Sequence, residues 1–479
     1  MSQQTETAGK IWFEAIDLIN QEGQVVDIQE LVVQFDLYES IYNKFVTARM
    51  VIADGVNLLK NYRVNGQEFI RISCKMDDGE RVSDADYSID KTFQIHKIHN
   101  VKRKGVLEAY EIELVSPRQF YTLRSRISRN YRGTYNDILV HLLTKEGSFK
   151  VDEFDYALPT SPEVQFIVPN WTIDKTIDFI CQQADSTTAE GDGAPAFHRG
   201  FFFFQSLNGG FRFMDIDGMM KLEQPATFTY GITQDKENPQ DKNFQIIDFH
   251  NPQLFDTLEG TKSGIYSGRQ MTYDPILKLE METHHDIGEV YNRKNHLGQA
   301  PMIRTTTNTN GFFETTKTTG SVGDSIELQT TDANYSPNRS IGSALKVSTK
   351  MVHAHSNASE YTSDENIASY DSGADTPAGF ERNAMHHILA QHRLEVTVPF
   401  RTDLTVGTVV NLIIPSSGSG LNSVDDGLND HRYLITDLRV AGDPISQEGI
   451  TVMGVCKESY AKRIEDVNPL LLRKIEGRE

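Results

Sequence analysis

The chain has little of several features that would assign it to a specialised class of protein. It contains 3 cysteines and 2 tryptophans among 479 residues. No stretch approaches the roughly 20 consecutive apolar residues that a membrane-spanning helix needs. The first ten residues, MSQQTETAGK, lack the apolar segment of a secretory signal. The sequence therefore predicts neither a membrane span nor a secreted fold stapled by disulfides.

The three cysteines, Cys74, Cys181 and Cys456, lie far apart, and each falls in a segment with a periodic apolar pattern. Thiols in such positions are typically buried and behave as small apolar groups. Their scarcity favours a reducing compartment, because structural disulfides are rare there. We therefore expect free, buried thiols in a protein that is assembled in a cytoplasm and released from it later.

Basic residues are also in deficit. Lys and Arg total 47 against 67 for Asp and Glu, which gives a formal net charge of −20. A dedicated nucleic-acid binder normally presents a basic patch, so this balance argues against specific nucleic-acid binding. It is compatible with a surface past which DNA slides, because an acidic wall repels phosphate.

Sequence signatures of catalysis are missing as well. The chain has no G-x-S-x-G, no Walker loop and no dinucleotide-binding fingerprint. The carboxylates of Asp152, Glu153 and Asp155 suggest the paired acids of a glycosidase, but adjacency in the sequence does not set the separation which that chemistry requires. Cys181 lies on the apolar stripe of a predicted helix, which is the wrong place for a nucleophile. We therefore predict no enzymatic activity and no catalytic residues.

Candidate metal ligands have unsuitable spacing. Two ligands on one helix face need a separation of three or four residues. The histidine clusters do not offer a zinc signature with this spacing; they are His284-His285-Asp286, His353-Ala-His355, and His386-His387 with His392. In Asp215-Ile-Asp-Gly218 the glycine is fourth, whereas a calcium loop of the EF-hand type has it sixth. We therefore expect surface histidines, a β-turn at Asp215–Gly218, and neither a metal nor a cofactor.

The segment Val164–Ala184, VQFIVPNWTIDKTIDFICQQA, is the most informative one. It predicts a strand that ends at Pro169, because proline cannot donate to a sheet ladder. Thr172 is the expected N-cap of a following helix. Apolar residues at helical spacing then form one buried stripe; they are Ile173, Ile177, Ile180, Cys181 and Ala184. Trp171 is expected to anchor the entry of this helix to a small core.

A second helix is predicted upstream, where Thr134 with Asp137 resembles a capping box. Its apolar residues recur at i, i+3, i+4, i+7 and i+8, which is typical of an amphipathic helix, and Gly147 closes it. Beyond Asn243 the pattern returns to β-structure. It predicts a strand over Phe244–Phe249, a short helix over Asn251–Leu258 and a strand over Ile276–Glu282.

The length suggests about three domains, and the patterning predicts a mainly β protein with an α+β middle module. We expect two β-barrel or sandwich domains to flank this module, with one Thr/Asn/Ser-rich insertion and a charged C-terminal tail. The predicted ranges are 10–120 for the first β-domain, 121–240 for the middle module, 241–290 plus 381–465 for the second β-domain, 291–380 for the insertion and 466–479 for the tail.

Several of these segments together resemble the central hub proteins of the baseplate of contractile-tailed bacteriophages (the T-even-like hub family), whose tube-like domains are shared with type VI secretion spike proteins. The resemblance touches all three predicted domains. The segments that carry it are Ser128–Leu139 and Val168–Thr172 in the middle module, Met50–Asp54, Asn57–Leu59 and Asn65–Glu68 in the first β-domain, and Met271–Pro275, Val398–Val410 and Tyr433–Thr436 in the second.

The resemblance implies a structural protein of the virion, found in the tail baseplate and assembled in the host bacterial cytoplasm. It implies a homotrimer in which two tail-tube-like domains per chain make six similar units around a channel for DNA ejection. Such a ring fits a hexameric tail tube, or a tube-initiator protein, on one side and a trimeric central spike on the other, with wedge proteins as candidate neighbours.

Two alternatives differ from this hypothesis. One is a receptor- or glycan-binding tail protein that uses residues 291–380 as its recognition surface. The other is the spike base of a type VI-like contractile injection system. Such spikes usually continue into a β-helical needle, and residues 1–479 hold no repeats of that kind, so a needle would be a separate polypeptide.

Overall fold

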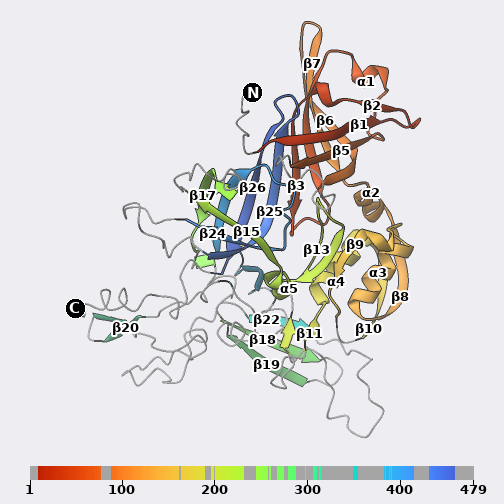
Figure 1. Ribbon diagram of the computed structural model, residues 1–479. Helices are drawn as coiled ribbons and strands as arrows, with labels where there is room; N and C mark the ends of the chain where they lie inside the picture. Colours follow the sequence, from red (N-terminus) through yellow and green to blue (C-terminus); the bar gives the residue numbers. More distant parts are fainter. Residues whose placement is uncertain are drawn as a thin grey trace, which may run out of the picture.

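A computed structural model gives the fold (Figure 1). Its described residues are 9–76, 88–160, 163–188, 196–198, 200–230, 244–256, 258–259, 267–274, 279–286, 297, 306–309, 312–315, 349–353, 382, 385–387, 389, 391–414 and 431–458. Over these residues the chain is mainly β, with an α+β module between two β-rich units. The predicted fold class is therefore confirmed.

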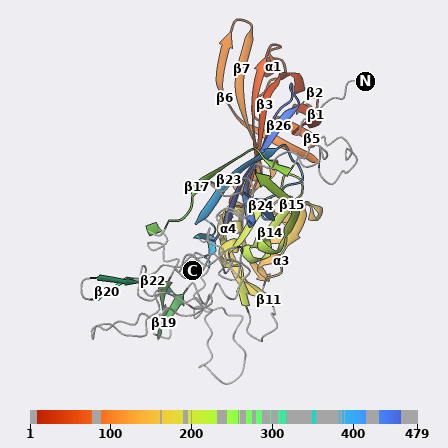
Figure 2. The same cartoon turned by 60° about the vertical axis from the view of Figure 1, so that its left-hand side comes forward.

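Unit 1 is formed by the first seven strands and one short helix, α1 (Leu58–Asn61). Its strands are β1 (Ile11–Ile19), β2 (Val25–Asp27), β3 (Val32–Ser40), β4 (Thr47–Asp54), β5 (Phe69–Met76), β6 (Ile89–Lys104) and β7 (Leu107–Val115). They lie in the sheet in the order β3-β4-β7-β6-β5-β1-β2. The hairpin of β6 and β7 projects from the rest of the molecule in both views (Figures 1 and 2).

Unit 2 is formed by strands from the second half of the chain. They are β15 (Glu223–Tyr230), β16 (Gln245–Ile246), β17 (Asp248–Gln253), β23 (His392–Pro399), β24 (Val409–Ile413), β25 (His431–Asp443) and β26 (Glu448–Lys457). Strand pairing places them in the order β17-β23-β26-β25-β24-β15-β16. If the strands of each unit are numbered 1 to 7 along the chain, both units have the same spatial strand order, 3-4-7-6-5-1-2.

The likeness of the two units extends to single residues. Strand β6 has a β-bulge directly after Ile95 against β7, and β25 has one directly after Ile435 against β26. The amide of Ile95 donates to the carbonyl of Glu68 at 3.0 Å, and the amide of Ile435 donates to the carbonyl of Thr408 at 2.9 Å. Bulges re-aim a strand at a defined place, so a shared bulge in a shared strand order indicates one fold used twice.

The two units also differ. Strand β1 is antiparallel to β5, whereas its counterpart β15 runs parallel to β24. In unit 2 the chain leaves the sheet after β17 and returns at β23. Within that excursion β18 (Ser267–Asp274), β19 (Leu279–Asp286) and β22 (Thr349–His353) form a separate three-stranded sheet, while β20 (Thr306–Thr309) pairs with β21 (Phe312–Thr315). The second unit is thus interrupted where the first has only the short connection at residues 41–46 between β3 and β4.

The middle module packs helices against small sheets. Its elements are α2 (Pro117–Arg124), β8 (Arg126–Gly133), α3 (Tyr135–Lys145), β9 (Phe154–Ala157), β10 (Val164–Thr172), α4 (Ile173–Gln183), β11 (Ser186–Thr188), β12 (Ala196–His198), β13 (Phe201–Gln205), β14 (Phe211–Asp215) and α5 (Ile216–Lys221). The predicted caps are confirmed: Thr134 accepts from the amide of Asp137, and Thr172 accepts from the amide of Lys175, each at 3.2 Å.

The predicted apolar stripes of α3 and α4 form the core of this module. The residues of these stripes are almost completely buried; they are Ile138, Leu139, Leu142, Leu143, Ile173, Ile177, Ile180 and Ala184. Trp171 is partly buried and packs against the ring of Phe179, with 5.4 Å between the ring centres. The ammonium group of Lys175 lies 4.9 Å from the centre of the Trp171 ring. The sequence-based account of both helices is therefore confirmed except at Cys181, which was predicted to be buried and is only partly so.

The predicted end of a strand at Pro169 is wrong. Strand β10 continues through Pro169 to Thr172, and its register against β8 shifts between Pro169 and Trp171. Asn170 has a φ of 54°, which absorbs the extra residue as a bulge. Because β8 and β10 form a two-stranded sheet, every strand in it is an edge strand, where a proline without an amide hydrogen is tolerated.

Two predictions beyond residue 243 also need correction. The expected helix over Asn251–Leu258 is wrong in its first part, because β17 runs to Gln253 and pairs with β23. The strand expected over Ile276–Glu282 is β19, which begins at Leu279. Strand β15, within the range predicted for the middle module, pairs with β24 of unit 2. The predicted domain boundaries themselves stay predictions.

Parts of the sequence-based account lie outside the described residues. These are the charged tail at 466–479 and most of the insertion at 291–380. Of the described helices, none has the length and apolar character needed to cross a membrane.

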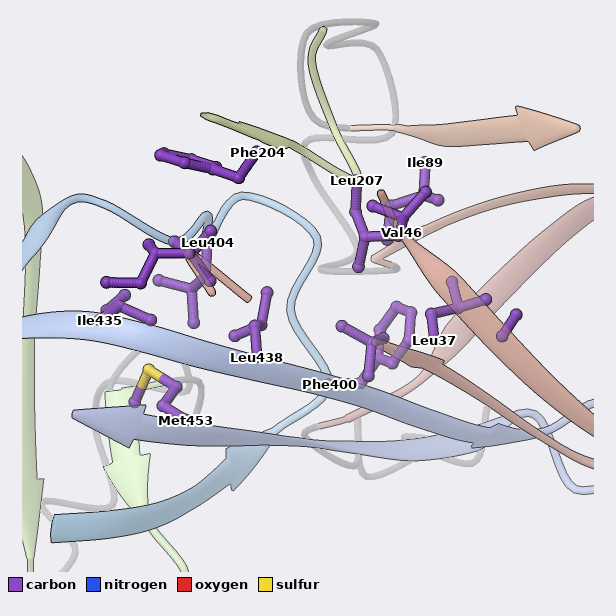
Figure 3. Close-up of a cluster of buried hydrophobic side chains, with 14 of the residues drawn as sticks. Leu37, Val46, Ile89, Phe204, Leu207, Phe400, Leu404, Ile435, Leu438 and Met453 are labelled. Atoms are coloured by element: carbon purple, nitrogen blue, oxygen red, sulfur yellow. The ribbon is translucent and has the colours of Figure 1, made fainter. Parts of the chain in front are cut away.

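One apolar core runs through both units and into the middle module. Figure 3 shows Leu37 of unit 1 close to Phe400 and Leu438 of unit 2, with Leu207 of the middle module above them. These side chains belong to one contiguous cluster. Burial of a large apolar side chain contributes about 1.5–3 kcal/mol, so the units are joined by packing as well as by strand pairing.

Candidate functional site

The junction between the two units is a continuous strand pairing, called here the seam. The second half of β25 pairs antiparallel with β3 from Asp437 opposite Ser40 to Gly442 opposite Phe35. The first half of β25 pairs with β24 of its own unit. A sheet of eight strands therefore runs without a break in the order β17-β23-β26-β25-β3-β4-β7-β6. The sequence alone offered no signal for this pairing, because the two strands are about four hundred residues apart.

The unit 1 part of the eight-stranded sheet has one apolar and one charged face. Phe35, Met50 and Ile112 are register partners across β3, β4 and β7, and each is buried. The neighbouring row on the opposite face consists of charged register partners, namely Asp36, Arg49, Glu113 and Lys97. Because successive residues of a strand point to opposite faces, these charged side chains share one face of β3, β4, β7 and β6. Beyond the seam the same row continues with uncharged residues, namely Ala441, Ile450 and Pro399.

Polar side chains reinforce the seam. The guanidinium of Arg439 donates to a carboxylate oxygen of Asp36 through Nη2 at 2.8 Å and through Nε at 3.1 Å. The hydroxyl of Ser40 donates to the carboxylate of Asp437 at 2.6 Å. Asp36 is buried while Arg439 is partly exposed, so this charge-assisted contact fixes the lateral position of β25 on β3.

Gly442 permits the closest approach at the seam. It lies opposite Phe35, and a Cβ at this position would come within 2.7 Å of the Phe35 ring and 2.5 Å of Ile11 Cδ1. Real Cβ atoms do not approach other heavy atoms this closely. The glycine is therefore required by the packing of the ring, and the strand conformation itself makes no such demand.

Glu39 ties all three parts of the molecule together. It belongs to β3 and is 2% exposed. One carboxylate oxygen accepts from the hydroxyl of Thr405 at 2.8 Å and from the amide of Val406 at 3.0 Å, both in the loop before β24. The other accepts from the amide of Leu207, in the β13–β14 hairpin, at 3.0 Å. Ser206 also contacts Thr405, at 2.9 Å between hydroxyl oxygens.

Burial raises the pKa of Glu39 above its usual range, while the hydrogen bonds from Leu207, Thr405 and Val406 act in the opposite direction. A buried carboxylate without partners would be costly. Here both oxygens are satisfied by donors from unit 2 and the middle module, so the group is tolerated only when all three parts are in place. No sequence motif marked Glu39, because its partners are distant in the chain.

The eight-stranded sheet ends at β6 on one side and at β17 on the other. Among the described strands, β6 beyond Gln94 pairs with β7, and β17 pairs with β23. These edges bound the eight-stranded sheet at its two ends. Val101 at the β6 edge is 57% exposed. Unprotected edges with exposed apolar side chains are sites for strand addition.

The predicted surface location of the histidines is wrong for His392. This residue is fully buried and lies 3.1 Å from the hydroxyl of Tyr433. Burial, with Lys457 nearby, lowers the pKa of His392 to about 4. Of the other histidines, His284 and His285 lie in β19, His353 lies in β22, and His355 is outside the described residues. Within the described residues, no three His, Cys, Asp or Glu side chains are grouped as metal ligands.

The remaining candidates have structural contacts. Asp215 caps the short helix α5 by accepting from the amide of Gly218 at 2.8 Å, so the expected β-turn opens a helix. Glu153 forms an ion pair with Arg118, and Asp155 lies 3.6 Å from Arg212. Asp152 is exposed. Glu153 and Asp155 therefore each lie next to an arginine of the middle module.

The cysteines are free, as expected, but their burial differs. Cys74 and Cys456 are buried, whereas Cys181 is partly exposed. Burial raises the pKa of the Cys74 thiol and of the Cys181 thiol to about 12. A thiol with a raised pKa is mostly protonated at neutral pH and is a poor nucleophile.

A cavity of about 340 Å³ opens where unit 1, the middle module and the segment before β23 meet. Lys44 and Asp178 on its wall form an ion pair at 2.8 Å. His386 packs against the ring of Phe202 at 4.6 Å between ring centres. Burial, with Arg382 nearby, lowers the pKa of His386 to about 4, so the imidazole is uncharged at neutral pH. These side chains hold the three parts of the molecule together.

No model of a known protein family matches the chain, and no curated protein matches it. Solved structures do resemble it. A tail protein from Neisseria meningitidis MC58 is 12% identical, with 93% of this chain and 96% of that chain covered and a TM-score of 0.49. The 43 kDa tail protein of prophage MuSo2 from Shewanella oneidensis is 10% identical, with 94% and 100% covered and a TM-score of 0.47. A component of the type VI secretion system of E. coli is 9% identical, with 95% and 78% covered and a TM-score of 0.39.

The role of Glu39 predicts a measurable loss of stability on substitution. In Glu39→Gln, one oxygen is replaced by an NH₂ group that faces a backbone amide donor. We expect the free energy of unfolding to fall by about 1–3 kcal/mol, the usual cost of an unsatisfied buried polar group. Chemical denaturation followed by fluorescence measures this. The matched control is Glu22→Gln, since Glu22 is exposed; an equal loss in both variants would contradict the role assigned to Glu39.

The direction of the pKa shift adds a pH dependence. Because the pKa of Glu39 is raised in the folded state, the folded protein binds a proton that the unfolded chain has already lost over the interval between the two pKa values. Its contribution therefore makes stability decrease as pH rises through that interval. Denaturation curves at mildly acidic pH should show this downward slope reduced in Glu39→Gln relative to the unsubstituted protein.

The close approach at Gly442 predicts a steric effect. Gly442→Ala should destabilise the protein by about 1–3 kcal/mol, because overpacking forces Phe35 or the strand to shift. The control is Gly55→Ala, where a Cβ would meet its nearest neighbour, Leu107, at an ordinary 3.8 Å. Thermal unfolding of both variants tests the claim, and an unchanged melting temperature for Gly442→Ala would refute it.

Proposed function

We propose that this chain is a structural ring protein of a contractile tail, a baseplate hub of which three copies surround a channel. The observation that carries the proposal is the seam: two units of the same strand order are joined edge to edge in one continuous sheet. A repeated edge-to-edge contact generates a ring when its rotation closes after a whole number of copies. Three chains then supply six similar units.

Such a ring reconciles two symmetries. Six similar units on one side can seat a hexameric tail tube or tube-initiator protein, whereas the true threefold symmetry matches a trimeric central spike. The proposal adds wedge proteins as candidate neighbours, no enzymatic activity, and a location in the virion tail after assembly in the host cytoplasm. The sequence resemblance to baseplate hubs supports it, and so does the duplicated fold.

The charged face of the eight-stranded sheet is proposed to line the channel through which DNA is ejected. Its carboxylates are largely paired, since Asp36 contacts Arg439, Glu111 contacts Arg49, and Glu113 contacts Lys97. A wall of alternating paired charges gives phosphate no cluster of unpaired cations to bind. DNA would therefore pass without sticking.

No second function is proposed. The receptor- or glycan-binding alternative depends on residues 291–380. Within that range the structure describes Leu297 and the strands β20, β21 and β22. No contact or charge pattern of described side chains favours it.

The ring predicts a defined mass. Native mass spectrometry of the purified chain at micromolar concentration should give three times the 54.1 kDa chain mass, and class averages from negative-stain electron microscopy should show a central channel. A monomer at every concentration tested, or a dimer with twofold symmetry, would refute the proposed function.

The channel lining predicts a gain of DNA binding. In Glu111→Lys with Glu113→Lys, the new side chains join Arg49, Lys97 and Lys102 on one face. We expect the variant ring to retard double-stranded DNA in a gel at low salt and to release it at high salt, because phosphate binding is salt-dependent. The control is Glu22→Lys with Glu30→Lys, which reverses two exposed charges away from this face. Equal retardation of DNA by both variant rings would contradict the proposal that the charged face lines the channel.

A further inference from the structure

The end of the β6–β7 hairpin has an unusual composition. Residues 101–107, called here the tip, have the sequence VKRKGVL, and every one of them is exposed. Gly105 has a φ of 67° and opens a two-residue turn between the register partners Lys104 and Leu107. Turns that face water are normally built from Gly, Asn, Asp, Ser or Pro, but the second turn residue here is Val106, which is 82% exposed. Clustered exposed apolar side chains typically mark an interaction site.

Three consecutive cations, Lys102, Arg103 and Lys104, form the centre of the tip. Arg103 is held by the hairpin itself, since its Nε lies 3.7 Å from a carboxylate oxygen of Glu108. In the described part of the chain, neither Lys102 nor Lys104 forms an ion pair. The two ammonium groups are therefore available to bind an anion outside the chain.

The tip belongs to a part of the molecule that has no acidic residues. Residues 97–107 and 55–67 contain neither Asp nor Glu, although acidic residues outnumber basic ones by 67 to 47 in the whole chain. The two segments meet, because a Cβ at Gly55 would lie 3.8 Å from Cδ1 of Leu107. Figure 1 shows α1, which lies in the second segment, beside this end of the hairpin. Exposed side chains of that segment extend the basic and apolar surface; they are Val56, Lys60 and Arg63.

The tip also stands clear of the acidic remainder of the chain. Both views show the hairpin projecting from the molecule (Figures 1 and 2). A Cβ at Gly105 would meet no heavy atom within 4 Å. Glu111 is four residues along β7 from Leu107, about 13 Å at the rise of a strand, which exceeds the screening length of about 8 Å at physiological salt. The net charge of −20 therefore only weakly opposes the approach of the tip to an anionic surface.

We propose that the tip docks on an anionic lipid surface, where its cations bind headgroup phosphates and Val101, Val106 and Leu107 enter the interface. Basic side chains next to exposed apolar ones are typical of proteins that lie on a membrane without crossing it. The cations are attracted by the negative surface potential, and the apolar side chains are buried at the boundary between headgroups and acyl chains. The contact goes beyond the proposed ring and does not require it, although three tips on one ring would reinforce one another.

A lipid surface fits the tip better than nucleic acid or a folded protein does. A β-ribbon that enters a DNA groove brings its strands alongside the phosphates, and here the strand behind the tip carries Glu108, Glu111 and Glu113. A lipid surface contacts the tip alone. The apolar residues flank the cations on both strands, so the tip has no single apolar face for a folded protein to cover. A fluid interface adapts to this shape.

Vesicle flotation of the full chain tests the contact. We expect binding to vesicles of phosphatidylcholine mixed with phosphatidylglycerol, release at high salt, and at least about tenfold weaker binding to phosphatidylcholine alone. Lys102→Gln with Lys104→Gln should lower the partition coefficient on mixed vesicles by about tenfold or more, because each cation near an anionic surface contributes to binding. The matched control is Lys145→Gln with Lys150→Gln, which removes two exposed lysines of the middle module and should leave binding unchanged.

Fluorescence separates insertion from surface attraction. Val106→Cys with an environment-sensitive dye should shift its emission to shorter wavelength when mixed vesicles are added, because the dye leaves water. The same dye on Val151→Cys, at an exposed valine of the middle module, should not shift. The unsubstituted chain treated with the dye accounts for the three native cysteines. Val106→Asn should weaken vesicle binding by about fivefold through the loss of apolar burial, whereas Val151→Asn should not.

Several results would overturn the lipid contact. These are no binding to mixed vesicles, an equal loss of binding in the two double-lysine variants, and a dye shift at Val106→Cys that accompanies trimer formation without vesicles, since the tip would then contact a second copy. Retardation of duplex DNA that depends on Lys102 and Lys104, in a chain that does not bind vesicles, would identify nucleic acid as the occupant instead. A trimer that does not bind vesicles leaves the proposed ring intact, whereas a monomer that binds them refutes the ring alone.

Discussion

The pairing of β25 with β3 is the constraint on which the rest of the structure depends. It converts two separate β-units into one sheet with a single apolar face, and it places Leu37 against Leu438 and Phe400 in a common core. Joining strands so distant in the chain has an entropic cost, but that cost rises only slowly with loop length. The buried apolar surface on one face and the hydrogen-bonded ladder offset it.

Glu39 adds specificity to this packing. An apolar side chain at its position would bury well enough but would leave the amides of Leu207 and Val406 without acceptors. A carboxylate satisfies donors from two other parts of the molecule simultaneously, which defines one relative placement of three modules. Its raised pKa reflects the cost of that choice.

Duplication explains both the regularity and the exceptions of the fold. The common strand order and the bulges after Ile95 and Ile435 are retained in both units. Other parts of the two units have diverged: β15 runs parallel to its neighbour where β1 is antiparallel, and unit 2 has a long excursion between β17 and β23.

The sequence by itself determined the local elements. Capping side chains at Thr134 and Thr172 and the apolar stripes that follow them set the two helices of the middle module, because these signals act within a few residues of each other. Strand periodicity likewise marked most of unit 1. The mainly β fold class and the presence of an α+β module were therefore predictable.

Tertiary structure decided the rest. The passage of β10 through Pro169, the burial of His392 against Tyr433, and the role of Glu39 all depend on groups that are distant in the sequence. Local patterns cannot report such partners, since register and edge choice are fixed by which strands meet across the whole chain. The candidate site consists of contacts between strands that are far apart in the sequence, so no local motif predicts it.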